Sequence, residues 1–169
     1  GYEKDEDLLN KLDLIKNAFV SIRNTVRNLI DLNRPGKEKK QPMDVNQVIE
    51  DTVALMSSHL KKNMVDVKLN LAATTTQIKA SPQQSGQGIM NLGNNAVEAI
   101  VAAPDFEEKL KKFSSIGGEI VIDTSIQDEK IIINLSDSGP GISNSDLEYI
   151  FDPFFTRKKI MGLGVGLSI

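Results

Sequence analysis

Residues 137–142 read Asp-Ser-Gly-Pro-Gly-Ile and follow the apolar segment 130–136 directly. Two further motifs flank this stretch in fixed order, Asn-Leu-Gly-Asn-Asn-Ala at 91–96 and Gly-Leu-Gly-Val-Gly at 162–166. Each motif alone is weak, because Gly-x-Gly spacings arise wherever a chain turns. An asparagine-bearing helix, a strand that ends in Asp-x-Gly-x-Gly and a late glycine-rich run rarely coincide. Together they predict a pocket for ATP.

The segments around these motifs predict helices layered on one face of a mixed sheet. Strands are expected where apolar residues alternate or cluster, at 65–71, 77–80, 119–125 and 130–136. Helices are expected over about 46–61, from Ser81-Pro82 to about 102, for a turn or two within 104–113, and as a short helix capped by Ser143 and reaching Ile150. Asp44, with Gln47 three residues on, predicts a capping box for the first of these helices.

The apolar residues of these segments define the expected core. The helix over 46–61 is expected to face inward with Val48, Ile49, Thr52, Val53, Leu55, Met56 and Leu60. The last two strands are expected to face the helical layer with Ile120, Ile122, Ile131, Ile133 and Leu135. These residues therefore predict one substantial hydrophobic core, shared by the helices and strands that follow the linker.

The N-terminal part of the chain predicts a long helix with one apolar seam. The seam residues are spaced alternately four and three apart, as in a heptad repeat: Leu8, Leu12, Ile15, Phe19, Ile22, Val26 and Leu29. Pro35 disfavours helical geometry at Arg34, so the helix is expected to occupy 1–34 and a linker 35–41. The seam can pack on its own domain, or it can pair with a second molecule, and the spacing alone leaves both open.

Composition excludes several classes of function. The chain has 169 residues, a net charge of -3 with both signs interspersed, and no cysteine. No basic footprint for nucleic acid, no disulfide framework and no thiolate metal site is therefore expected. No apolar run approaches the roughly 20 residues needed to span a bilayer, so we expect no direct membrane contact and a cytoplasmic location, although a longer parent protein could be membrane-anchored.

The sequence Phe-Asp-Pro-Phe-Phe-Thr-Arg-Lys at 151–158, followed by the glycine-rich run, resembles the phenylalanine box and last motif of sensor histidine kinases. These enzymes belong to a wider group with gyrase, Hsp90 and MutL. The resemblance implies an α+β two-layer sandwich of the Bergerat type over 42–169, preceded by the second helix of a dimerisation and phosphotransfer hairpin. The resembled domain normally continues through two further strands, so its C-terminal end is expected to be missing.

The stretch at 137–142 is expected to hold the adenine base. The carboxylate of Asp137 can accept hydrogens from the exocyclic amine of adenine, whereas guanine presents an oxo group there. Gly139 and Gly141 would let the backbone approach the base closely, and Ile142 would wall it. The alternative is an aspartate that only closes an Asx turn.

Two asparagines one helical turn apart share a face of the motif helix. Asn95 offers a neutral amide oxygen suited to Mg²⁺, and the matching residue of the resembled kinases binds that metal. Asn91 stands where ATP-hydrolysing relatives place a glutamate, and an amide cannot act as a general base. Its presence favours phosphoryl transfer to another acceptor. Asn94 falls off this face, and Glu98 can either orient a metal-bound water or lie in solvent.

The segment after the phenylalanine box is expected to form a lid over the triphosphate. Thr156, Arg157 and Lys158 precede the glycines, and a cation at Lys158 would offset charge on the transferred phosphoryl group. The alternative is a basic surface loop. Backbone N–H groups and a helix start would contact the phosphates from the last motif, through Gly162, Gly164, Gly166 and Leu167.

The resemblance implies a kinase that transfers the γ-phosphoryl group of Mg²⁺-bound ATP to a histidine, from which it passes to the receiver domain of a response regulator. The implied partners are a second copy of the chain, joined through the N-terminal helix, and the phosphoacceptor hairpin. The only histidine, His59, lacks the phosphoacceptor motif, so we expect the chain alone not to label itself. The alternatives are a dimerisation module with a degenerate nucleotide site, suggested by Ser85, Gly88 and Gly93 within the motif helix, and an ATPase of the gyrase or Hsp90 kind.

Overall fold

The computed structural model describes residues 11, 12, 15, 19, 39–72, 77–113, 116–152, 155 and 156. The chain divides into two compact units. One comprises Gly1–Lys37 and Ser145–Ile169, and the other comprises Glu38–Asn144. The second unit carries the sheet, its helices and the central stretch of the nucleotide motifs. Among the described residues, no helix combines the length and apolar character needed to cross a membrane.

A three-stranded mixed sheet forms the base of the second unit. Strand β4 (Gly118–Gln127) lies in the centre, pairs in parallel with β2 (Val65–Asn70) and pairs antiparallel with β5 (Lys130–Asp137). Asp128 and Glu129 join β4 to β5 with φ angles of 49° and 61°. A two-residue hairpin loop with positive φ at both positions matches the right-handed twist of its strands. The prediction of a mixed sheet is thereby confirmed.

A second, two-stranded sheet pairs β1 (Gln41–Asp44) with β3 (Gln77–Ala80) in antiparallel fashion. Strand β3 was expected, whereas β1 was not, and it begins inside the predicted linker. Its four residues include Pro42, which cannot donate to a ladder and normally argues against a strand. Met43 is its buried residue, and one apolar side chain in four residues gives no alternation to detect.

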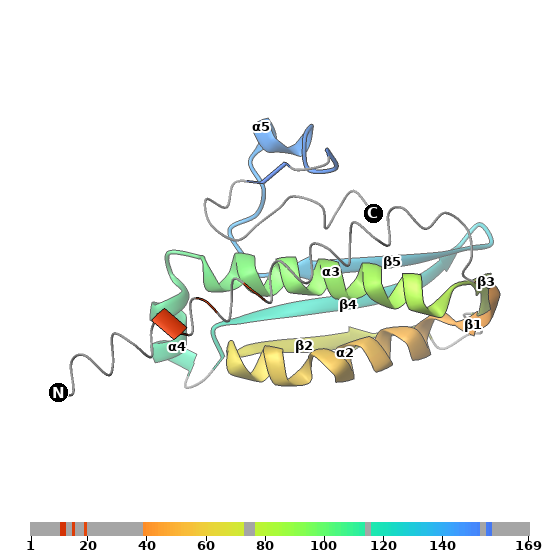
Figure 1. Ribbon diagram of the computed structural model, residues 1–169, viewed down its shortest axis with the longest axis horizontal. Helices are drawn as coiled ribbons and strands as arrows, with labels where there is room; N and C mark the ends of the chain where they lie inside the picture. The colour runs from red at the N-terminus through yellow and green to blue at the C-terminus, as the bar shows by residue number, and fades with distance from the viewer. Residues whose placement is uncertain are drawn as a thin grey trace. The chain divides into compact units, whose positions relative to one another are not determined.

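Two long helices, α2 (Val45–Lys62) and α3 (Pro82–Val101), lie along one face of the β2–β4–β5 sheet (Figure 1). Two short helices follow, α4 (Phe106–Phe113) and α5 (Asn144–Leu147). Ser81 caps α3 by accepting a hydrogen bond from the Gln84 N–H at 3.2 Å, and Pro82 occupies the first helical position, where its missing N–H costs nothing. The predicted layering of helices on one face of a mixed sheet is thus confirmed for α2 and α3.

The start of α2 corrects the expected capping box. Asp44 is the N-cap, and its carboxylate accepts the Asn46 N–H at 2.9 Å. The Gln47 amide donates instead to the Asp51 carboxylate at 3.0 Å. The reciprocal half of the predicted box is therefore wrong, because Gln47 finds a partner one turn forward on the helix surface.

The core lies between the two long helices and the sheet. Its most enclosed side chains are Ile49, Val97, Ile100 and Ile120. Leu55, which was expected to face inward, is 75% exposed, because it lies about 100° around α2 from the buried Met56. Ile133 was also expected to be covered and is 43% exposed, since β5 is an outer strand among the three described strands of this sheet.

Hydrogen bonds among Asn46, Ala72 and Thr124, called here the polar clip, connect α2 to the sheet. No sequence motif predicted them. The hydroxyl of buried Thr124 on β4 accepts the Ala72 N–H at 2.7 Å and donates to the Asn46 amide oxygen at 3.0 Å. The Asn46 amide nitrogen in turn donates to the Ala72 carbonyl at 2.9 Å. The polar groups of Asn46, Ala72 and Thr124 that meet here are thus paired with one another, as burial requires.

Candidate functional site

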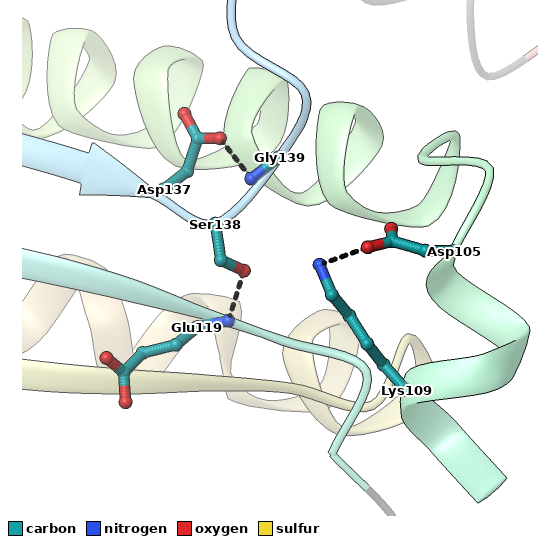
Figure 2. Close-up of polar contacts among 6 residues, drawn as sticks. All are labelled: Asp105, Lys109, Glu119, Asp137, Ser138 and Gly139. Atoms are coloured by element: carbon teal, nitrogen blue, oxygen red, sulfur yellow. Dashed lines mark hydrogen bonds and ion pairs between the residues drawn. The ribbon is translucent and has the colours of Figure 1, made fainter. Parts of the chain in front are cut away.

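The Asp137 turn begins where β5 ends. Asp137 pairs with the buried Ile120 in the strand register, and residues directly opposite each other share a face of the sheet. Its carboxylate therefore lies on the side of the helices. One carboxylate oxygen accepts the Gly139 N–H at 2.8 Å (Figure 2). The Asx turn that the sequence left as an alternative is present and uses one of the two oxygens. Among the described residues, no hydrogen bond is made to the second oxygen.

Two glycines shape this turn in different ways. A Cβ on Gly139 would lie 2.7 Å from the Asp137 carboxylate and 3.1 Å from the Ala99 Cβ on α3. At Gly141 no atom of the described part of the chain lies within 4 Å of an added Cβ, but its φ is 75°, which side chains disfavour. A glycine is thus required at position 139 because neighbouring atoms approach the backbone closely. A glycine is required at position 141 because of its left-handed backbone conformation. Ile142 follows with a side chain that is 54% exposed.

Helix α3 presents the two predicted asparagines. Asn91 and Asn95 are both half-buried and lie one turn apart. Among the residues described by the structure, none forms a hydrogen bond with the Asn95 side chain. Ala99, the residue against which Gly139 packs, is one turn further along the same helix. The close approach of Gly139 therefore brings the Asp137 turn and the asparagine face of α3 to one place.

The groups gathered here fit an adenine nucleotide with a divalent cation. A carboxylate oxygen accepts the hydrogens of an exocyclic amine, and a half-buried amide oxygen is a hard ligand of the kind that Mg²⁺ prefers. Glu98, beyond Asn95 on α3, is exposed. Among the described residues, the carboxylate of Asp137 and the amide of Asn95 are thus chemically compatible with the predicted ligand.

The phosphate side of the predicted pocket is only partly described. Thr156 is exposed and belongs to the other compact unit. The remaining predicted contacts lie outside the described residues, namely Lys158, Gly162, Gly164, Gly166 and Leu167. Their roles stay predictions.

Two ion pairs are formed by charged residues of the same compact unit. Lys109 on α4 pairs with Asp105 at 3.1 Å (Figure 2). Lys68 on β2 forms an ion pair with Glu119 on β4. The hydrogen bond between the two side chains, together with the negative charge of Glu119, raises the pKa of Lys68 above its usual value. Both members of the second pair are substantially exposed, so its contribution to stability is small.

Comparison with known proteins gives consistent similarities. The family "Histidine kinase-, DNA gyrase B-, and HSP90-like ATPase" matches residues 80–169, more than half of the chain. The signal transduction histidine-protein kinase AtoS of Escherichia coli is 30% identical over 94% of the chain. Sporulation kinase D of Bacillus subtilis is 28% identical over 99% of it. The chain spans only 24% of AtoS and 30% of sporulation kinase D.

Solved structures show the same fold. The catalytic domain of histidine kinase ThkA matches with a TM-score of 0.62 and 26% identity, over 77% of this chain and 76% of that domain. Histidine kinase ThkA in complex with response regulator protein TrrA matches with a TM-score of 0.69 and 22% identity, over 90% of this chain and 41% of the kinase. The predicted two-layer α+β fold is thereby confirmed.

Proposed function

The chain belongs to the family of histidine kinase-, DNA gyrase B- and HSP90-like ATPases, and on that basis we propose that it is the ATP-binding catalytic domain of a two-component sensor histidine kinase. The observation that carries this proposal is the contact between the Asp137 turn and α3. Gly139 packs against Ala99, so a base-reading carboxylate and a metal-binding amide face one site. The curated relatives, which are sensor histidine kinases, support the kinase branch of the family.

The free carboxylate oxygen of Asp137 selects adenine in this proposal. Because the other oxygen is held by the Gly139 N–H, the carboxylate has a defined direction before the nucleotide arrives. It accepts the exocyclic amine of adenine, and it repels the oxo group that guanine presents at the same place. ATP should therefore bind in preference to GTP.

Asn95 is the proposed metal ligand, and Asn91 and Lys158 act on the phosphoryl group. Bound Mg²⁺ would neutralise charge on the triphosphate. Asn91 has no basic group with which to activate water, so the site is suited to keep the γ-phosphoryl group for a side-chain acceptor. This feature argues against an ATPase of the gyrase or Hsp90 kind.

The acceptor in this proposal is a histidine on a dimerisation hairpin, and the phosphoryl group then passes to a response-regulator receiver domain. Residues 1–34 would form the second helix of that hairpin, 35–41 a linker and 42–169 the catalytic domain. His59 lies exposed within α2, and the Asn63 amide donates to its backbone carbonyl, but Leu-Lys-Lys follows it in place of the phosphoacceptor motif. The chain alone should therefore not label itself when incubated with γ-labelled ATP, and stable self-labelling would contradict this part.

The N-terminal helix is the proposed dimer contact. Three of its seam residues are described as helical and exposed, with Leu12 at 53%, Ile15 at 52% and Phe19 at 69%. An apolar stripe of this spacing is stabilised when a second copy covers it. The lack of cysteine fits a cytoplasmic setting.

Competition between nucleotides tests the proposal. Displacement of a fluorescent ATP analogue by ATP and by GTP should show a clear preference for ATP in the wild type. Asp137→Asn should weaken ATP binding and reduce the preference, because an amide offers a donor where the carboxylate accepts. Asp128→Asn is the matched control, since it makes the same change at the exposed opposite end of β5. Equal effects of the two substitutions would contradict the proposal.

A further inference from the structure

Ser138 follows Asp137 directly and is joined to Glu119 on β4 by two hydrogen bonds. The Ser138 N–H donates to the Glu119 carbonyl at 3.0 Å, and the Ser138 hydroxyl accepts the Glu119 N–H at 2.9 Å (Figure 2). In a regular antiparallel ladder the second bond would end on a backbone carbonyl. The hydroxyl takes that place, so the pairing of β5 with β4 extends one residue beyond Asp137 while the backbone is already free to turn.

The start of β4 leaves room for this hydroxyl. A Cβ on Gly118 would lie 2.7 Å from the Ser138 Oγ and 2.3 Å from the Cγ2 of Ile100. Ile100 belongs to α3 and is 1% exposed, so it has little freedom to move. The absence of a side chain at Gly118 therefore lets α3 and the Ser138 hydroxyl meet at the beginning of β4.

Asp137 is consequently held from both sides. Its own backbone lies in the ladder opposite Ile120, and the next residue is tied to Glu119. One of its carboxylate oxygens is fixed by the Gly139 N–H. Of these restraints, the Ser138 hydroxyl is the one that a side-chain substitution can remove without touching either the carboxylate or the glycines.

We propose that Ser138 is a positioning residue for nucleotide selection, whose hydroxyl holds the turn in the conformation that presents the Asp137 carboxylate to the base. This inference rests on the proposed function. Without the hydroxyl the turn occupies other conformations for part of the time, and the apparent affinity falls by the fraction of molecules that remain competent. The loss should be at most about fivefold, the factor by which one hydrogen bond of average strength changes the equilibrium between the turn conformations.

Three variants separate this role from a general loss of stability. Ser138→Ala removes the hydroxyl, and Ser138→Thr keeps it on a β-branched side chain that strands accommodate well. Ser136→Ala is the matched control, because Ser136 is exposed on the same strand. Dissociation constants for ATP and GTP are measured by displacement of the fluorescent analogue, at a temperature where unfolding curves show all variants to be fully folded. Ser138→Ala should bind ATP measurably more weakly, by at most about fivefold, with a lower ATP-over-GTP ratio. Ser138→Thr and Ser136→Ala should match the wild type.

Two results would overturn the inference. An unchanged dissociation constant and ratio in Ser138→Ala would show that the hydroxyl does not position the turn. Equal weakening by Ser138→Ala and Ser138→Thr would show that the hydroxyl is not the operative group. Failure of the proposed function looks different, because the wild type itself would then not bind ATP, or would bind it without dependence on Asp137.

Discussion

Replacement of Gly88 by alanine should stabilise the protein by about 1 kcal/mol, the difference in helix propensity between the two residues. Gly88 lies well inside α3 and is exposed, and no atom of the described residues lies within 4 Å of the position that a Cβ would take. The methyl group therefore meets no neighbour, and the whole propensity gain should be realised. In a folded unit of this size the melting temperature should rise by about 4 °C.

Gly93 provides the contrasting case on the same helix. A Cβ there would lie 2.7 Å from the Cε of Met56 and 3.0 Å from its sulfur. Both residues line an apolar cavity of about 10 Å³, into which the end of the methionine can partly move. Overpacking commonly costs about 1–3 kcal/mol, so Gly93→Ala should gain less than Gly88→Ala or lose stability. Combining Gly93→Ala with Met56→Leu, which lacks the clashing end, should recover part of the difference.

Urea denaturation of the single and double variants, followed by circular dichroism, measures these free energies. The comparison is internal, because both glycines carry the same propensity term and differ only in what surrounds them. Destabilisation by Gly88→Ala would refute the reasoning, since it would mean that α3 is not a regular, uncovered helix at this position. Equal gains from both substitutions would refute the assigned contact with Met56.

Three further results are expected. Thr124→Val should lower the free energy of unfolding by about 1–3 kcal/mol, because it leaves Asn46 and a backbone N–H without their partner; urea denaturation that shows no loss would contradict the polar clip. Gly141→Ala should weaken ATP binding in a calorimetric titration, because a left-handed conformation costs an alanine about 1–2 kcal/mol, and an unchanged affinity would count against the turn. Lys68→Met should lower stability slightly at neutral pH. Since the folded-state pKa of Lys68 is raised above 10.5 by Glu119, this difference should vanish as pH rises through that pKa, and denaturation curves that differ equally at all pH values would refute the pairing.

Periodicity and caps predicted most of the second unit. The alternation of Val65 and Val67 placed β2, and Ser81-Pro82 placed the start of α3, because these signals are local and agree with the tertiary packing. Strand β1 was missed because its stability comes from pairing with β3 far along the chain. A sequence of four residues that contains Pro42 carries no sign of such a long-range partner.

Side-chain details depended on geometry that a sequence does not contain. Leu55 was predicted to lie in the core because it is apolar. The buried face of α2 contains Thr52 and Met56, and Leu55 lies outside it. Gln47 fitted the capping-box spacing, although the pairing that forms is with Asp51. The rotation of α2 against the sheet decided the exposure of Leu55, whereas the partner of Gln47 was decided by a local contact on the exposed surface of the helix.

The candidate site was predictable as a set of residue types but not as an arrangement. Asp137, Asn91 and Asn95 were chosen from their motifs. The contact of Gly139 with Ala99 arises where the end of β5 meets α3. The bond between Ser138 and Glu119 arises where β5 pairs with β4, and the sequence specifies neither meeting. Ser138 gave no signal in the sequence beyond its position next to Asp137, because serine is common in turns for other reasons.

The central claim is that this domain holds an ATP pocket built on the Asp137 turn and Asn95. Calorimetric titration of ATP into the folded protein, with and without Mg²⁺, tests it most directly when repeated with Asp137→Ala. The account predicts binding at a single site that Mg²⁺ strengthens and that the substitution abolishes. Absence of binding in the wild type, from protein shown to be folded, would contradict the account and leave dimerisation through the N-terminal helix as the remaining function.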